Sequence, residues 1–515
     1  MEFLPRSLLA RIQPLLRWTV AAAAIAYISL YLLLAFLRMN VPYDLERLEG
    51  SFLEQVGRVL HGQPMFTAPA LAYVPMVYTP VYFYVSALAV KLMGFGFTPL
   101  RLVSILSSLG CFVVLYRFVQ RESSSHYFAL VAAGLFAATV RETGDWFELA
   151  RPDSLYIFLL VLSAYLLRWK RGAAWLVLAG CLAGLSFLTK QTALLVILPL
   201  LAYALTLGLR AFAAYAGTAA LLAGGVIALL HVASGGWSTF YLFTLTSSFL
   251  TSKGHIVLFW INDIFRVLPI AVAFAVLYFL DAAWSEDRRP AWFHLCFGAG
   301  MVGASWAYSL NWGAYLNGRL PAYFFLSLAM GLGAWKGVEM LRAHSGDRAA
   351  VGRAVVFAAL LIQFCVLPYD PRLVIPHRQD RELRRELAAR VAQIPGPVWV
   401  PNHSYLSAAA GKESFAQILN LCTVLVAGDP QKVAPLRREL HDALRQRRFR
   451  AIIQDGEWDR DVVAGVYRAD LLENYTKSEE IMYPPGATPR SILGLPAAPR
   501  VAFVIFVPKS AEPAP

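Results

Sequence analysis

An apolar run at residues 18–37 limits what this chain can fold into more than any other feature of its sequence. A helix needs about 20 apolar residues to cross the hydrocarbon core of a bilayer. The run is longer than the apolar core of a signal peptide and lacks a small-residue cleavage site. Because Arg6, Arg11 and Arg17 precede it, we expect an uncleaved first membrane helix with a cytoplasmic N-terminus.

Further apolar runs predict a helical polytopic membrane protein with about eleven crossings. These runs cover residues 101–119, 126–141, 153–167, 173–188, 192–208, 211–232, 265–281, 291–310, 319–337 and 354–368. The composition agrees, since 15% of the 515 residues are charged, whereas a soluble domain has about 25%. A chain with so little charge needs lipid as part of its solvent.

The distribution of basic residues orients these helices. Basic side chains gather in most of the connections that the count places in the cytoplasm, as the positive-inside rule requires. They are Arg117, Arg121, Arg168, Lys170, Arg171, Arg210, Arg288, Arg289, Lys336, Arg342, Arg348 and Arg353. The connection at 281–290 is nearly neutral and fits less well. Since the basic residues are scattered and no nucleic-acid motif is present, we expect no nucleic-acid partner.

The apolar residues 79–93 would reverse every later helix if they crossed the membrane. We therefore expect a helix that lies at the outer interface, a depth that suits its aromatic residues. A short ordinary crossing is the alternative.

Residues 370–515 differ in character, because they hold 20 of the 46 basic and 17 of the 33 acidic side chains. Strand-like runs at 397–400, 451–453 and 501–507 and helical patterns at 382–393 and 432–447 predict a small α/β domain. The expected division is a transmembrane domain, 1–369, and an extracytoplasmic domain, 370–515. The outer loops of the transmembrane domain are expected at 38–100, 142–152, 233–264 and 311–318. Asn402 and His403 follow the first strand, where they could bind a ligand or form part of a solvated loop.

Two outer loops carry acids near membrane level. The first contains Asp44, Glu46 and Glu49, and the second contains Glu148 and Asp153. Such acids could merely complement a helix dipole or cap a helix. Ionisable groups at this depth are often functional, however, and a carboxylate can take a proton from an acceptor hydroxyl.

Three cations are expected on the same side of the membrane, namely Arg151, Lys190 and Arg319, and Asn317 stands next to the last. Each alone could simply anchor its helix at the interface. Together with the acids, they could offset the charge of a phosphate leaving group.

This pattern resembles the C-type (GT-C) membrane glycosyltransferase superfamily, which includes protein O-mannosyltransferases and the transferases that add aminoarabinose to lipid A. The resemblance covers residues 40–330. It is carried by Glu49-Gly50 ahead of Gly62, Tyr78-Thr-Pro-Val-Tyr82, Arg101-Leu-Val-Ser104, Ala150-Arg-Pro-Asp-Ser-Leu155, Lys190-Gln191 and Leu320-Pro-Ala-Tyr323.

The resemblance implies an inverting transfer from a polyprenyl-phosphate sugar to a lipid, glycan or protein acceptor, outside a bacterial cytoplasmic (inner) membrane. A carboxylate of the first outer loop is expected to be the base. Many relatives have Asp-Glu where this chain has Leu48-Glu49. Either Asp44, which we favour, or Glu49 takes this role, or activity is lost, and Asp153 matches the second acid. The expected substrate-binding residues are Glu46, Tyr78, Glu148, Arg151, Lys190, Asn317 and Arg319.

Some related oligosaccharyltransferases use a divalent metal and others do not, so a role for Mg or Mn stays open. Two other functions compete with the transferase. A transporter or flippase of lipid-linked saccharide would place polar groups near mid-membrane, often in repeated broken helices, and this chain shows no repeat. An inactive assembly protein that binds a lipid-linked sugar would explain Leu48.

Overall fold

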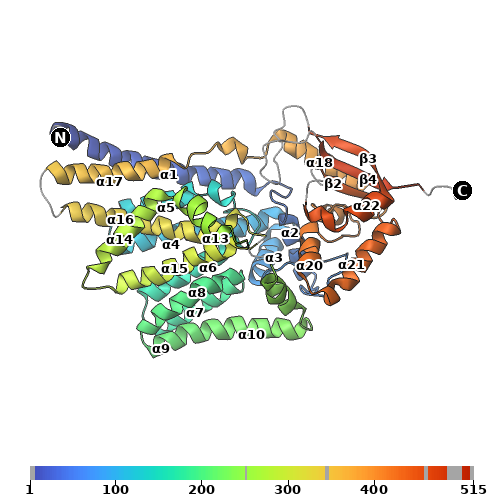
Figure 1. Ribbon diagram of the computed structural model, residues 1–515, viewed down its shortest axis with the longest axis horizontal. Helices are drawn as coiled ribbons and strands as arrows, with labels where there is room; N and C mark the ends of the chain where they lie inside the picture. The colour runs from blue at the N-terminus through green and yellow to red at the C-terminus, as the bar shows by residue number, and fades with distance from the viewer. Residues whose placement is uncertain are drawn as a thin grey trace.

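The computed structural model describes residues 6–249, 252–311, 313–342, 347–456, 462–483 and 501–510. A bundle of long helices forms one end of the molecule, and a small sheet with its own helices forms the other (Figure 1). Both α1 and α17 run along one side of the bundle, and α1 begins at the end far from the sheet (Figure 1). The helices and the sheet therefore occupy opposite ends of one elongated molecule.

The bundle helices coincide with the apolar runs of the sequence. They are α1 (Arg6–Met39), α4 (Phe97–Ser123), α5 (His126–Ala138), α6 (Asp153–Trp169), α7 (Ala173–Phe187), α8 (Leu194–Thr206), α10 (Thr218–Ala233), α14 (Pro269–Ala283), α15 (Arg289–Ser309), α16 (Leu320–Arg342) and α17 (Asp347–Cys365). Short helices join them: η1 (Arg141–Thr143), η2 (Gln191–Ala193), α9 (Leu209–Phe212), α11 (Trp237–Thr239), α12 (Leu245–Ser247), α13 (His255–Leu258) and η6 (Leu316–Arg319), with π-helical turns at Ala213–Gly217, Phe240–Thr244 and Phe259–Phe265.

The multi-pass helical fold expected from the sequence is confirmed. In the described part of the chain, five helices are by themselves long and apolar enough to cross a membrane. A sixth span results if His255–Phe265 and Pro269–Ala283, bent by 93° at their junction, count as one. Several other bundle helices are shorter than a full crossing, so the number of eleven crossings stays a prediction.

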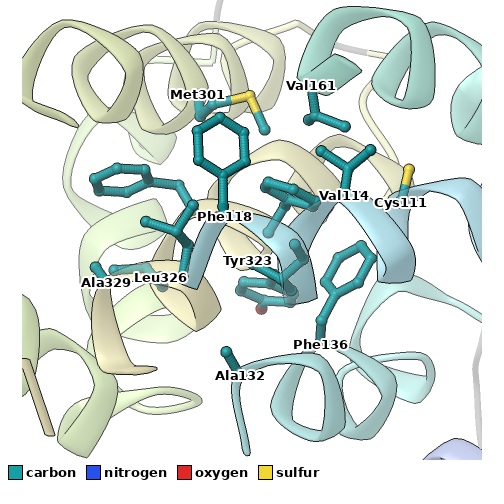
Figure 2. Close-up of a cluster of buried hydrophobic side chains, with 14 of the residues drawn as sticks. Cys111, Val114, Phe118, Ala132, Phe136, Val161, Met301, Tyr323, Leu326 and Ala329 are labelled. Carbon is teal, nitrogen blue, oxygen red and sulfur yellow. The ribbon is translucent and has the colours of Figure 1, made fainter. Parts of the chain in front are cut away.

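Helix α16 forms the centre of the bundle. Its side chains are buried over most of its length, as expected of a helix that is apolar on all faces. Figure 2 shows Tyr323 of α16 in the same apolar cluster as Phe118, Phe136 and Met301, from α4, α5 and α15. Beside this cluster α1 lies against α5, and a Cβ at Gly134 would come within 2.3 Å of Ala24. The small residue is what allows these two helices to pack so closely.

Two short helices, α2 (Glu49–Leu60) and α3 (Val81–Met93), follow α1 on the side of the sheet. Helix α2 buries Phe52 and Val56 fully. Helix α3 has 13 residues, too few to cross a bilayer. Leu88 and Leu92 of α3 are 61% and 81% exposed, so this helix has an uncovered apolar face, as an interfacial helix should. Its depth in the membrane stays a prediction.

The C-terminal sheet has the strand order β1-β2-β4-β3. The strands are β1 (Val398–Trp399), β2 (Ala451–Asp455), β3 (Tyr475–Met482) and β4 (Val501–Pro508). The main helices are α18 (Arg378–Gln393), α20 (Ile418–Ala427) and α21 (Pro430–Arg445). Shorter helices are α19 (Tyr405–Ala409), α22 (Arg468–Asn474), η7 (Pro371–Leu373) and η8 (Val462–Val466). Strand β1 pairs in parallel with β2, while β4 lies antiparallel to both β2 and β3. The small α/β fold is confirmed, and its boundary at residue 370 stays a prediction.

The sheet end shares a hydrophobic core with α2, α3 and the start of α4. The Tyr405 ring packs edge-on against Phe97, with ring centres 5.1 Å apart. It also covers Gly50, where a Cβ would lie 2.6 Å from the Tyr405 Cδ1 atom. The first outer loop is thus held between the bundle and the C-terminal fold.

Candidate active site

The carboxylate of Glu49 is fully buried and accepts four hydrogen bonds. The Arg101 guanidinium donates to Oε1 at 3.0 Å and to Oε2 at 2.6 Å. The backbone N–H groups of Leu45 and Ala150 donate at 2.6 Å each. Four donors satisfy the acceptor capacity of a carboxylate. Glu49 therefore joins the two acidic loops to α4 and has no oxygen left for a substrate.

Arg101 fastens the start of the first outer loop as well. Its side chain is also fully buried, and it donates to the carbonyl oxygens of Arg38, Val41 and Tyr43 at 3.2, 2.6 and 2.7 Å. A charged residue inside an apolar run normally has such a specific purpose. Here it fixes the chain where α1 ends and the loop begins.

Asp44 faces the C-terminal fold. Its Oδ2 atom lies 2.6 Å from His403 Nδ1, and Tyr405 donates its hydroxyl to Oδ1 at 3.0 Å. The other His403 nitrogen lies 3.2 Å from Asp455 and 2.7 Å from the Arg384 guanidinium. His403 is 2% exposed, so the interpretation of a solvated loop histidine is wrong. Both oxygens of Asp44 are engaged between the two halves of the molecule.

In this contact the attraction between opposite charges outweighs the repulsion between Arg384 and His403. Burial and Arg384 lower the pKa of His403, but Asp44 and Asp455 outweigh them and raise it above its usual value. Burial alone would raise the pKa of Asp44, yet His403 and Arg384 bring it below its usual value. Asp455 shows the same balance and also has a lowered pKa. These shifts favour an imidazolium ion held between two carboxylates.

Asp153 is the first residue of α6 and points to a different set of partners. Lys190 Nζ and Asn317 Nδ2 both donate to its Oδ1 atom, at 2.7 and 2.8 Å. Tyr308 in turn donates to Asn317 Oδ1 at 3.3 Å. The N-cap position is Pro152 and Asp153 makes no capping hydrogen bond, so a purely capping role is wrong. Its buried Oδ2 atom has no hydrogen-bond partner among the described residues.

Arg151 connects Asp153 with the first outer loop. Its guanidinium donates to Glu46 Oε2 at 3.0 Å and to the Tyr78 hydroxyl at 2.9 Å, and it lies 4.8 Å from the centre of the Phe52 ring. Its buried Nε atom lacks a partner among the residues described. Burial raises the pKa of Glu46, although Arg151 opposes this. Its Oε1 atom takes no hydrogen bond from the described residues, and its side chain is 17% exposed.

The fold thus brings together side chains from five separate segments, which we call the outer cluster. It consists of Glu46, Tyr78, Arg151, Asp153, Lys190, Tyr308 and Asn317. Arg151 and Asp153 are close enough for their charges to interact, and Lys190 Nζ lies 4.7 Å from the centre of the Tyr308 ring. Arg151 and Lys190 are 3% and 4% exposed, so neither extends to solvent as an interface anchor would.

Two residues expected at the site lie in separate ion pairs. Glu148 pairs with Arg38, and burial raises the pKa of its carboxyl to about 7 although Arg38 opposes the shift. Arg319 pairs with Asp263 at 2.6 Å and donates to the Glu142 carbonyl at 2.9 Å. A role for Glu148 or Arg319 in substrate binding stays a prediction.

Sequence reasoning missed the site roles of Tyr308 and of Arg101, the ion-pair partner of Glu49. The signal for Arg101 was present, since it is a charge within an apolar run. Tyr308 gave no signal, because one aromatic residue near the end of a membrane helix is ordinary.

Both carboxylates of the outer cluster, Glu46 and Asp153, are paired with cations, and a role for Mg or Mn stays a prediction. No group of three or more His, Cys, Asp or Glu side chains within the described ranges could hold a metal ion. Mg and Mn prefer several oxygen ligands, whereas Asp153 is surrounded by Lys190, Asn317 and the charge of Arg151.

Comparisons of structure define the class of fold. The structure is similar to that of ArnT from Cupriavidus metallidurans, solved bound to undecaprenyl phosphate and in the apo state, with a TM-score of 0.59 and 13% sequence identity over 93% of this chain and 97% of that one. It is also similar to an oligosaccharyltransferase from Archaeoglobus fulgidus in complex with Zn and sulfate, with a TM-score of 0.52 and 13% identity over 88% of this chain and 69% of that one.

A family model agrees with this fold. Residues 75–237 match the family described as dolichyl-phosphate-mannose-protein mannosyltransferase, and this segment contains Tyr78, Arg151, Asp153 and Lys190. No curated protein sequence matches the chain. The comparisons therefore show a fold shared with these solved structures over most of the chain, and a sequence match to this family over residues 75–237.

Proposed function

We propose that this protein transfers a sugar from a polyprenyl-phosphate donor to an acceptor hydroxyl at the extracytoplasmic face of a bacterial cytoplasmic membrane. The observation that carries the proposal is the pair of buried cations, Arg151 and Lys190, beside two carboxylates, Glu46 and Asp153. Three of these four residues lie in the segment that the family model matches. The lipid-bound relative of similar fold supports a polyprenyl-phosphate ligand.

The two cations suit the leaving group. When the bond between the sugar carbon and the phosphate oxygen breaks, a phosphodiester becomes a phosphate monoester and gains negative charge. A guanidinium and an ammonium already placed in a poorly hydrated site stabilise that charge without reorganising. The unpartnered Arg151 Nε atom is a donor available for this purpose.

We assign the base to Glu46 in place of Asp44 or Glu49. The oxygens of Asp44 and Glu49 are already engaged, whereas Glu46 Oε1 takes no hydrogen bond from the described residues. Burial raises the pKa of Glu46, which makes it a better proton acceptor near neutral pH. Glu46 takes the proton as the acceptor oxygen bonds to the sugar carbon from the face opposite the phosphate, so that the configuration inverts.

Asp153 has a supporting role in this scheme. Its Oδ1 atom holds Lys190 and Asn317 in place, and its unpartnered Oδ2 atom can accept a hydrogen bond from a sugar hydroxyl. A site built to hydrogen-bond a hydroxyl discriminates strongly against analogues that lack it. The acceptor is a lipid, a glycan or a protein that reaches the outer face.

The test is a transfer assay with purified protein in nanodiscs, radiolabelled polyprenyl-phosphate sugars and an envelope extract. Wild type should move the label to a new product, and Glu46→Gln should lower the rate by about 10²- to 10⁴-fold. The matched control is Glu382→Gln, which removes an acid from an exposed ion pair in α18 and should keep full activity.

Two results would count against the proposal. Full activity of Glu46→Gln would reject Glu46 as the base. Transfer from no donor by the wild type, with the donor bound or moved between leaflets, would favour the inactive sugar-binding protein or the transporter.

A further inference from the structure

A cavity of about 390 Å³ lies at the end of the bundle opposite the sheet. It is enclosed by the first part of α1, the N-terminus of α5, the end of α16 and the start of α17. Figure 1 shows these ends of α1, α16 and α17 together, far from the C-terminal fold. The cavity is therefore remote from the outer cluster, and the positive-inside orientation places it at the cytoplasmic leaflet.

The charged side chains in the cavity wall are cationic. Arg17, Arg342 and Arg353 line it, and no carboxylate is among the lining residues that the structure describes. Arg342 forms an exposed ion pair with Glu339 at 2.7 Å. Arg17 and Arg353 form no ion pair within the described part of the chain. Two guanidinium charges therefore face the cavity with no counter-ion among the described side chains.

Other groups in the wall agree with an anionic occupant. The Arg17 guanidinium stacks 4.9 Å from the centre of the Tyr127 ring, and the Tyr127 hydroxyl donates to the Arg17 carbonyl at 3.0 Å, so Arg17 is held in place. Ser125 caps α5, and the positive end of that helix dipole adds to the field of the arginines. Arginine binds phosphate oxygens through a planar, two-pronged donor.

Apart from Gln13, the remaining wall is apolar and continues into the bundle. Phe128, Val338 and Phe357 line the cavity and are buried. A free inorganic ion would leave this side unfilled, whereas a lipid presents a phosphate joined to glycerol and acyl chains. Basic pockets between membrane helices on the cytoplasmic side are suited to anionic headgroups.

We propose that this cavity binds the phosphate headgroup of an anionic phospholipid from the cytoplasmic leaflet. Such a lipid joins α1 and α5 to the α16–α17 hairpin and stabilises the fold by mass action. This inference is independent of the proposed transferase activity, because none of its residues belongs to the outer cluster.

The test measures the thermal unfolding midpoint and, by native mass spectrometry, the lipids that the protein retains, in two lipid compositions. Protein is placed in nanodiscs of phosphatidylcholine alone or with phosphatidylglycerol. Phosphatidylglycerol should raise the midpoint of the wild type and be retained in preference. The double variant Arg17→Gln/Arg353→Gln should lose this preference on the order of 10-fold, with an unchanged midpoint in pure phosphatidylcholine.

Two variants make the result specific. Arg171→Gln/Arg210→Gln removes two basic residues from the same predicted side but outside the cavity, and should behave as wild type. Arg17→Lys/Arg353→Lys keeps both charges and should recover part of the preference. This variant still tests the proposal if the glutamine variant folds poorly.

The proposal is overturned if the glutamine variant keeps the full preference, or if both double glutamine variants lose it equally. It is also overturned if inorganic phosphate, without anionic lipid, gives the same rise in midpoint, since the cavity would then bind a soluble anion. Recovery by the lysine variant together with no response to inorganic phosphate supports a lipid.

Discussion

The buried pair of Glu49 and Arg101 permits a quantitative test of what the first outer loop acid does. Glu49→Gln keeps the size of the side chain but removes its charge and turns one oxygen into an N–H donor. The guanidinium of Arg101, which has no exposure to solvent, would then lose its counter-ion. Breaking a buried ion pair on one side costs about 3–5 kcal/mol.

The backbone raises this cost. Leu45 N–H and Ala150 N–H each donate to a different oxygen of Glu49, so an amide that replaces the carboxylate must face one of them with its NH₂ group. An unsatisfied buried donor costs about 1–3 kcal/mol. Since native stabilities are about 5–15 kcal/mol, we expect Glu49→Gln to be strongly destabilised.

The assay is denaturant unfolding in mixed micelles, followed by tryptophan fluorescence, for Glu49→Gln, Arg101→Met and the double variant. The double variant should be less destabilised than the sum of the two single ones, because neither charge is then left unpaired. Glu382→Gln, from an exposed pair, should change stability by less than about 1 kcal/mol. Wild-type stability of Glu49→Gln with loss of transfer alone would refute the reasoning and return Glu49 to the role of base.

Three further predictions concern charge. Arg151→Lys should lower kcat by about 10²- to 10³-fold in the transfer assay, because an ammonium cannot contact Glu46 and Tyr78 through two parallel donors; activity equal to wild type would remove Arg151 from the phosphate site. The raised pKa of His403 means that its charged form contributes stability below its unfolded pKa of about 6.5, and this contribution is lost as the pH rises through the folded value. The lowered pKa of Asp44 has the opposite effect, because the stability that it contributes is lost as the pH falls through its folded value. In a profile of unfolding midpoint against pH, His403→Gln should therefore abolish the fall on the alkaline side. An unchanged profile would contradict the charge assignment. EDTA should leave transfer unchanged, since Lys190 and Arg151 supply the positive charge in the outer cluster; a loss that Mg or Mn restores would show that this account is wrong.

Local sequence pattern was enough for much of the architecture. Apolar runs of membrane length can only be satisfied by helices that bond their own backbone groups, which is why the bundle helices coincide with them. The strands β1, β2 and β4 are buried apolar runs and were predicted. Strand β3 was not, because five of its eight residues are exposed, and a polar segment of this kind looks like a loop until β4 pairs with it.

The sequence by itself also nominated Arg151, Asp153 and Lys190, since charges near a membrane surface are costly and seldom without purpose. It could not decide between Asp44, Glu46 and Glu49, which lie within one short loop and have the same chemistry. Their different surroundings come from distant segments: Arg101, 52 positions from Glu49, and His403, 359 positions from Asp44. The reactivity of a carboxylate depends on which donors surround it and how well water is excluded, and only the tertiary structure brings those donors to it.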